Sequence, residues 1–125
     1  MSGSSIEITG ANIESTITDG GIVLMDFWAS WCSPCRAFAP TFEAAAAKYP
    51  DITFGKIDTE ANRDLAGSLN ISSIPTLMIF RDGILVFRQP GALPPKALDE
   101  LIQEVQKLDM DDVRKQIASQ ADAQA

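Results

Sequence analysis

The sequence contains no histidine at all, and this absence excludes several kinds of site. Ser-His-Asp and Cys-His nucleophile pairs both depend on an imidazole that accepts the proton. Most zinc sites also use histidine as a ligand. Any nucleophilic chemistry in this chain must therefore find its proton acceptor among other side chains.

Positive charge and long apolar runs are scarce too. The chain carries 10 Lys and Arg against 17 Asp and Glu, which gives a net charge of −7. The basic residues are scattered, whereas binding of nucleic-acid phosphates needs them clustered. No apolar run is long enough to cross a bilayer, and residues 1–5 lack the basic-then-apolar pattern of a signal peptide. We therefore expect a cytoplasmic protein that binds neither nucleic acid nor membrane.

Only two cysteines are present, and Cys32 and Cys35 are three positions apart. They follow an apolar run at 22–28 and precede a helix-forming run at 36–48. A C-x-x-C pair at a strand-to-helix turn is typical of a dithiol that exchanges disulfides. Buried structural thiols are one alternative. A metal site is another, but two thiolates supply only half of a tetrahedral site, so we expect no metal.

Cys32 is expected at the N-terminus of the helix that follows. Pro34 is tolerated in a first helical turn, where its missing N–H costs nothing. Free backbone N–H groups and the helix dipole would then favour the thiolate, which is the attacking species in disulfide exchange. Cβ atoms three residues apart in a helix are about 5–6 Å apart, against about 3.5–4.5 Å in a disulfide. The pair can therefore close only if Cys32 occupies the non-helical cap.

Asp26 is the only charged residue in the apolar run 22–28. Burial there should raise its pKa toward neutrality, which makes it the candidate base for Cys35. The alternative is an aspartate that faces solvent at a strand end. Lys56 belongs to the next strand pattern and could face Asp26 and modulate its titration, or it could be a solvated strand lysine.

Hydrophobic periodicity and turn residues predict five strands and four main helices in one domain. The strands are expected at 6–8, 22–28, 52–58, 76–80 and 84–88, and the helices at 12–18, from the cysteines to 48, 60–68 and 94–108. This order predicts an α/β fold, with a central five-stranded mixed sheet and helices on both faces.

The chain continues beyond Leu108 with an acidic stretch at 109–112. Val113 and Ile117 are four residues apart, so a short extra helix capped by Asp109 is expected, followed by a frayed tail at 119–125. We therefore expect a domain at 1–108 and a C-terminal extension at 109–125. The extension is most simply a solvated appendage, and a role in partner binding stays open.

Five segments together resemble the thioredoxin family in order and spacing. They are MDFWASWCSPC at 25–35, GKID at 55–58, SIPT at 73–76, FRDG at 80–83 and GA at 91–92. The resemblance covers about residues 5 to 108 and implies the thioredoxin fold. It also implies a monomeric protein-disulfide reductase that binds no cofactor and cycles between a Cys32–Cys35 dithiol and a disulfide. Its partners would be disulfide-containing proteins and a thioredoxin reductase, which would supply electrons from NADPH.

The same resemblance implies a groove for an extended segment of the target protein. The Ile74–Pro75 peptide bond would be cis and would pack against the disulfide. Because Pro75 has no N–H, the backbone near Ile74 stays open to pair with the target. The residues that would line this groove are Trp31, Ile74, Pro75, Gly91 and Ala92.

Ser33 departs from the family pattern, which usually has glycine between the first cysteine and the proline. Its hydroxyl could donate a hydrogen bond to the Cys32 thiolate, or the loss of glycine could strain the turn. Two other functions therefore stay open. One is a thioredoxin-like oxidant or isomerase, although such relatives usually carry histidine in the x-x pair. The other is a redox-regulated binding module, which only Ser33 and the acidic tail favour.

Overall fold

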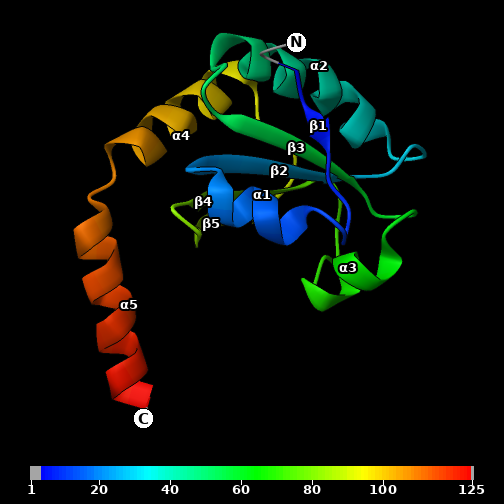
Figure 1. Cartoon of the computed structure of the whole chain (residues 1–125). Helices are drawn as coiled ribbons and strands as arrows, with labels where there is room; N and C mark the ends of the chain where they lie inside the picture. Colours follow the sequence, from blue (N-terminus) through cyan, green and yellow to red (C-terminus); the bar gives the residue numbers. More distant parts are fainter. Residues whose placement is uncertain (1–3, 125) are drawn as a thin grey trace.

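The computed structural model describes residues 4–124 of the chain and contains five strands and five helices (Figure 1). In chain order these are β1 (Ile6–Glu7), α1 (Ile13–Asp19), β2 (Ile22–Trp28), α2 (Ser33–Lys48), β3 (Thr53–Asp58), α3 (Arg63–Ser68), β4 (Thr76–Arg81), β5 (Ile84–Pro90), α4 (Pro95–Lys107) and α5 (Met110–Gln124). The strands form one sheet in the order β1-β3-β2-β4-β5. The predicted five-stranded sheet is confirmed.

β2 lies at the centre of the sheet and explains its mixed character. It pairs in parallel with β3 and antiparallel with β4. Asp26 is opposite Lys56 on one side and Leu77 on the other. The five residues 23–27 are all buried, as an apolar run covered on both faces requires.

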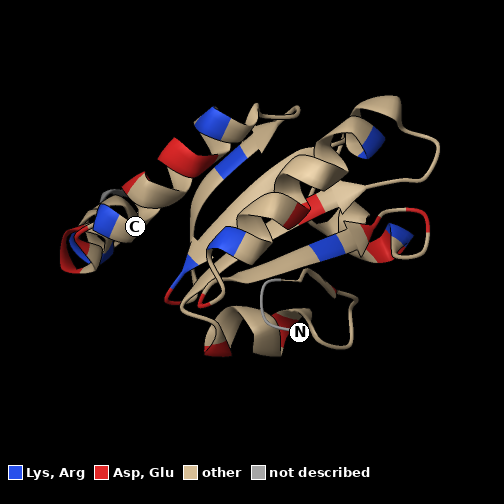
Figure 2. Cartoon of the chain, turned by 90° about the horizontal axis from the view of Figure 1, so that it is seen from above, with Lys and Arg blue, Asp and Glu red and all other residues tan. Residues whose placement is uncertain are grey.

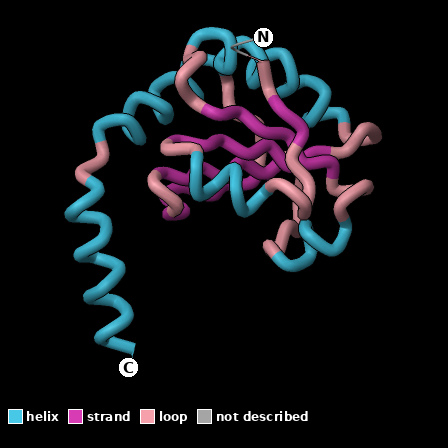
Figure 3. Tube along the Cα trace, viewed as in Figure 1, coloured by secondary structure: helices cyan, strands magenta, loops and turns pink. Residues whose placement is uncertain are grey.

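Helices cover both faces of the sheet, as predicted (Figure 3). α2 and α4 cover the face that carries Leu24, with Phe42 and Ile102 buried beneath them. The Phe42 ring meets Phe54 of β3 edge-on, with 5.3 Å between centroids. α1 and α3 cover the opposite face, where Phe27 is fully buried. The two apolar clusters hold β2 between them and fix the ends of the strands from which the active-site loops emerge.

α3 begins three residues later than the sequence predicted, at Arg63 rather than at residue 60. The carboxylate of Asp58 accepts the backbone N–H groups of Glu60 at 2.9 Å and Ala61 at 3.3 Å. Such side-chain bonds offer the backbone a turn in place of a helix. The segment after β3 therefore forms a loop beside the end of β2.

α5 is longer than predicted, so the expected frayed tail from residue 119 is wrong for the described residues. The helix continues through Gln124, and Ala125 lies outside the described part of the chain. Alanines at 118, 121 and 123 favour this continuation through their high helix propensity. The cap is as predicted, since the carboxylate of Asp109 accepts the N–H of Asp112 at 3.2 Å.

α5 leads away from the rest of the fold (Figure 1). Its first turn is anchored by Met110, which is 7% exposed, and Arg114 lies 3.5 Å from Asp82. Arg81 secures the preceding turn by donating to the carbonyls of Val105 at 2.7 Å and Leu108 at 2.9 Å.

Charged residues of both signs are distributed along the helices, strands and loops rather than gathered in one element (Figure 2). Within residues 4–124, no helix has the length and apolar character needed to cross a bilayer.

Gly55→Ala tests the tight contact between β3 and Ile8, the residue that follows β1. A Cβ atom on Gly55 would overlap the side chain of Ile8, which is fully buried. We expect the free energy of unfolding to fall by about 1–3 kcal/mol, because the core cannot absorb the added volume without distortion. Chemical denaturation measures this. The control is Gly67→Ala, where nothing lies within 4 Å and stability should not fall. Equal stabilities for Gly55→Ala and wild type would contradict the packing argument.

Candidate active site

The two cysteines lie at the N-terminus of α2, joined by a disulfide with Cα atoms 5.2 Å apart. Cys32 is the N-cap residue, with an extended backbone (φ −87°, ψ 110°), and Cys35 lies in the first helical turn. The N–H of Cys35 donates to Sγ of Cys32 at 3.2 Å. The predicted cap position is therefore confirmed, and a backbone N–H already points at the sulfur that would carry the negative charge.

Both cysteines are largely covered in the disulfide form. Cys32 is 4% exposed and Cys35 is 2% exposed. The neighbouring Trp31, Ser33 and Pro34 are exposed and form a rim around them. A target disulfide must therefore reach Cys32 across this rim, a degree of covering that the sequence did not indicate.

The segment before β4 lies against the disulfide. The Ile74–Pro75 bond is cis, as the resemblance implied, and the carbonyl oxygen of Ile74 is 3.8 Å from Sγ of Cys32. The carbonyl of Pro75 accepts the N–H of Gly91 at 2.7 Å. Gly91 has φ +101°, a backbone conformation that favours glycine. The exposed pair Gly91 and Ala92 is thereby placed beside Pro75.

Trp31, directly before Cys32, is 64% exposed. It lines a shallow pocket of about 190 Å³ together with Ile74 and four further residues: Thr59, Ile71, Ser72 and Ser73. Two of the five residues predicted for the groove, Trp31 and Ile74, line this pocket together. Two others, Pro75 and Gly91, are joined by a backbone hydrogen bond.

Glu60 is a residue at this site that the sequence analysis did not identify. It accepts the indole N–H of Trp31 at 2.9 Å and pairs with Arg63 at 2.6 Å. The hydrogen bond from Trp31, followed by that from Arg63, holds the pKa of Glu60 below its ordinary value. No local pattern could have found this contact, because the two residues are 29 positions apart.

Asp26 is buried, as predicted, and is 1% exposed. Neither carboxylate oxygen has a hydrogen-bond partner among the described residues. Burial raises the pKa of Asp26 from 3.8 to about 7, although the charge of Lys56 opposes this shift. Glu43 on α2 adds to it through its negative charge. The alternative of a solvent-facing aspartate is therefore excluded.

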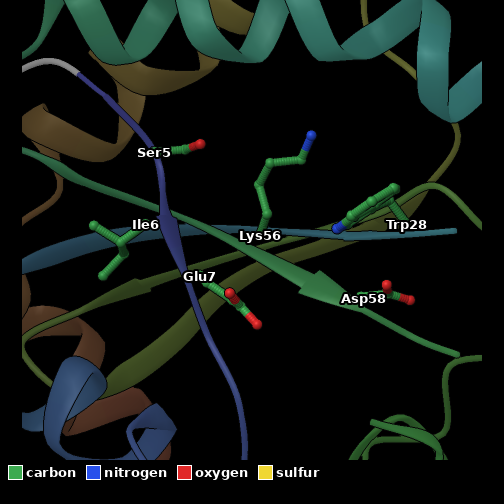
Figure 4. Close-up of a pocket in the computed structure, with 6 residues that line it drawn as sticks. All are labelled: Ser5, Ile6, Glu7, Trp28, Lys56 and Asp58. Carbon is green, nitrogen blue, oxygen red and sulfur yellow. The ribbon is translucent and has the colours of Figure 1, made fainter. Parts of the chain in front are cut away.

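Lys56 lies next to Asp26 in the register of β2 and β3. Figure 4 shows its side chain rising from β3 toward α2, and its Nζ lies 4.8 Å from the centroid of the Trp28 ring. Lys56 and Trp28 line a pocket of about 330 Å³ with Ser5, Ile6, Glu7 and Asp58. Alternate residues of a strand share a face, so Asp26 and Trp28 point to the same side of β2. This pocket brings solvent to the face of the sheet on which Asp26 lies.

Of the two contributions of Ser33 considered from the sequence, the structure excludes the strained turn, and the hydrogen bond to a Cys32 thiolate concerns the reduced form. The backbone of Ser33 is helical, so the turn does not need glycine there. Its hydroxyl accepts a hydrogen bond from Nη2 of Arg36 at 3.1 Å, and no hydrogen bond joins it to Cys32 in the disulfide form described. The sequence analysis did not single out Arg36.

Comparison with known proteins agrees with this geometry. The thioredoxin family model matches residues 4–118. A putative thioredoxin 2 from Streptomyces coelicolor is 55% identical over 117 residues, which is 94% of this chain and 87% of the relative. The thioredoxin of Bacillus subtilis is 41% identical over 91 residues, which is 72% of this chain and 88% of that protein.

Solved structures give the same result. A mutant thioredoxin from Halobacterium salinarum matches with a TM-score of 0.79 at 31% identity, covering 86% of this chain and 95% of that chain. Thioredoxin f from spinach chloroplast, in its short form, matches with a TM-score of 0.76 at 30% identity, covering 84% and 96%. The chain belongs to the thioredoxin family.

Its activity is thiol–disulfide exchange at the Cys32–Cys35 pair, and it is a protein-disulfide reductase. Within residues 4–124, no group of three or more His, Cys, Asp or Glu could hold a metal ion.

Asp26→Asn tests how much the buried carboxylate lowers the free energy of unfolding when it is ionised. With the pKa raised from 3.8 to about 7, the folded state binds more protons than the unfolded state between these values. Stability should therefore fall as pH rises through this window, by on the order of 4 kcal/mol when Asp26 is fully ionised.

The variant should lose this pH dependence and be more stable than wild type at about pH 8, with little difference at about pH 4. Denaturant unfolding at several pH values measures it, with the exposed Asp51→Asn as control. A variant that is less stable than wild type at the higher pH would contradict the assignment.

Proposed function

We propose that this protein reduces disulfides in cytoplasmic proteins and is itself reduced by thioredoxin reductase with electrons from NADPH. The observation that carries this proposal is the placement of Cys32 at the cap of α2, with the N–H of Cys35 directed at its sulfur. The exposed rim beside it leaves room for a protein substrate. Both reducing components are present in a cytoplasm, where disulfides rarely persist.

In the first step, the thiolate of Cys32 attacks one sulfur of the target disulfide. The target S–S bond breaks, its other sulfur leaves as a thiolate, and a mixed disulfide forms between target and Cys32. The helix N-terminus stabilises the attacking thiolate by roughly 0.3–2 kcal/mol. Trp31, Ile74, Pro75, Gly91 and Ala92 hold the target segment, which pairs with the backbone near Ile74.

In the second step, Cys35 transfers its proton to Asp26 and its sulfur attacks Sγ of Cys32. The Cys32–Cys35 disulfide forms, the second target sulfur leaves, and the target has gained two electrons. Asp26 suits this role because its pKa of about 7 lets it accept a proton near neutrality. It lies on the sheet face covered by α2, the helix that carries Cys35, and Lys56 adjusts its affinity for the proton.

Residues 1–108 form the reductase in this proposal, and the protein acts as a monomer. Residues 109–125 form an appendage, because α5 contacts the remaining fold through its first turns and then leads away from it (Figure 1). Pro34 fixes the first turn of α2 between the two cysteines without needing an N–H.

An insulin-reduction assay with NADPH and a bacterial thioredoxin reductase tests this function. Wild type should turn over, and Cys32→Ser should be inactive because it lacks the attacking sulfur. Cys35→Ser should stop after the first step and accumulate a mixed disulfide with the target, visible on non-reducing gels. Ser119→Ala, an exposed change on α5, serves as control. Turnover by Cys32→Ser would refute the assignment.

The role of Asp26 is tested by separating the two steps in stopped flow. Asp26→Asn should form the mixed disulfide at the wild-type rate and release the target at least about tenfold more slowly, since it has lost the general base. The wild-type release rate should rise with pH through about 7, as Asp26 ionises, and the variant should lack this rise. An equal slowing of both steps would indicate a structural defect instead.

A further inference from the structure

Arg36 lies directly after the dithiol, and its side chain bonds to residues on both sides of Cys32 in the sequence. Its Nη1 donates to the carbonyl oxygen of Ser30 at 2.8 Å, and its Nη2 donates to Oγ of Ser33 at 3.1 Å. One acceptor stands two residues before Cys32 and the other stands one residue after it. The guanidinium is thus held across the turn that presents the attacking sulfur.

We propose that Arg36 stabilises the thiolate of Cys32 through its charge, and that Ser33 is a positioning residue that holds Arg36 in place. The inference deepens the proposed function and rests on Cys32 being the attacking group. It also gives Ser33 a physical role, since glycine at this position would offer Nη2 no acceptor.

The charge of Arg36 is not neutralised by an acidic side chain. The ion pairs of the described residues join other side chains, and none of them includes Arg36. Both of its acceptors are uncharged oxygens, a carbonyl and a hydroxyl. No carboxylate among the described residues therefore offsets the attraction between this charge and a thiolate at Cys32.

The position of Arg36 is unfavourable for the helix itself. Cations are stabilising at helix C-termini and acidic residues at N-termini, because of the direction of the helix dipole. The first turn of α2 has no acidic residue, and Arg36 follows directly after it. An acidic side chain there would favour the helix but repel the thiolate, so this arrangement suits the sulfur rather than the helix.

Three other charged groups lie in the same region, and none of them bonds to the backbone of the turn around Cys32. Asp26 lies beneath α2 and is negative when ionised, and Lys56 lies beside it in the sheet. Glu60, in the loop after β3, is paired with Arg63. Arg36 is the cation whose contacts bracket the attacking sulfur.

Ser33 contributes by restricting where the guanidinium can go. An exposed arginine with one anchor can swing about that anchor, whereas two anchors use the fixed fork of the guanidinium. Removal of the Ser33 hydroxyl should therefore weaken the effect of Arg36 and have no effect of its own. This dependence distinguishes positioning from a direct hydrogen bond between Ser33 and the thiolate.

The test is a titration of the reduced full-length protein, following the ultraviolet absorbance of the thiolate. Arg36→Met should raise the pKa of Cys32 by about half a unit, since the charge that is removed is exposed to solvent. Ser33→Ala should raise it by a smaller amount, and Arg36→Lys should fall between wild type and Arg36→Met. The double variant should match Arg36→Met alone. Lys115→Met removes the same charge from α5 and should leave the pKa unchanged.

Salt provides a second readout. The difference between wild type and Arg36→Met should shrink at about 1 M salt, where exposed charges are screened within about 3 Å. An unchanged Cys32 pKa in Arg36→Met would overturn the inference, as would equal shifts from Ser33→Ala with and without Arg36. If Arg36 and Ser33 had only a structural role, their variants would change the unfolding midpoint but would not shift the Cys32 pKa in this order.

The titration does not depend on turnover, so the two proposals fail separately. Wild type that does not reduce insulin but titrates as expected refutes the proposed function and leaves the charge effect in place. Normal insulin reduction with a Cys32 pKa insensitive to Arg36 refutes only the further inference.

Discussion

The contact between the N–H of Cys35 and Sγ of Cys32 is the interaction on which the site depends. It exists because Cys32 keeps an extended backbone while Cys35 is already helical. That arrangement requires β2 to deliver the chain to the start of α2 at a fixed place, which the two apolar clusters on either side of the sheet ensure. The fold thus places one sulfur where a helix begins and leaves its partner within bonding distance.

The second constraint is the burial of the Asp26 carboxyl group, which lowers the stability of the folded state when the group is ionised. Asp26 occupies a central strand position that neighbouring positions fill with apolar side chains, and its oxygens have no partner among the described residues. Burial raises the pKa of Asp26 to about 7, and in the proposed mechanism this carboxylate is the proton acceptor of a chain without histidine. In that proposal, the buried carboxylate takes the role that an imidazole has in many other nucleophilic sites.

Much of the site could be predicted from local patterns. The apolar run around Asp26 indicated burial, and the cysteine spacing with Pro34 indicated the helix cap. The contacts of Glu60 with Trp31 and of Arg36 with Ser33 could not be predicted, because they depend on loop geometry and side-chain conformation. The resemblance, rather than any residue pattern, supplied the cis bond at Pro75.

Some features of the fold could likewise be predicted from the sequence, and others could not. The order of strands and helices along the chain and the mixed five-stranded sheet could be predicted from the sequence pattern, whereas two helix boundaries could not. α3 starts late because Asp58 holds the preceding turn, a contact that competes locally with the helix. α5 extends farther than expected because alanine propensity outweighs the tendency of a terminal segment to fray.

The most direct test of the account is to find which sulfur of the reduced protein reacts first. Brief treatment near neutral pH with less than one equivalent of iodoacetamide, followed by fragmentation mass spectrometry, identifies the alkylated cysteine. The account predicts that the label is found on Cys32, whose thiolate the helix cap stabilises. Labelling of Cys35, or equal labelling of both cysteines, would contradict it.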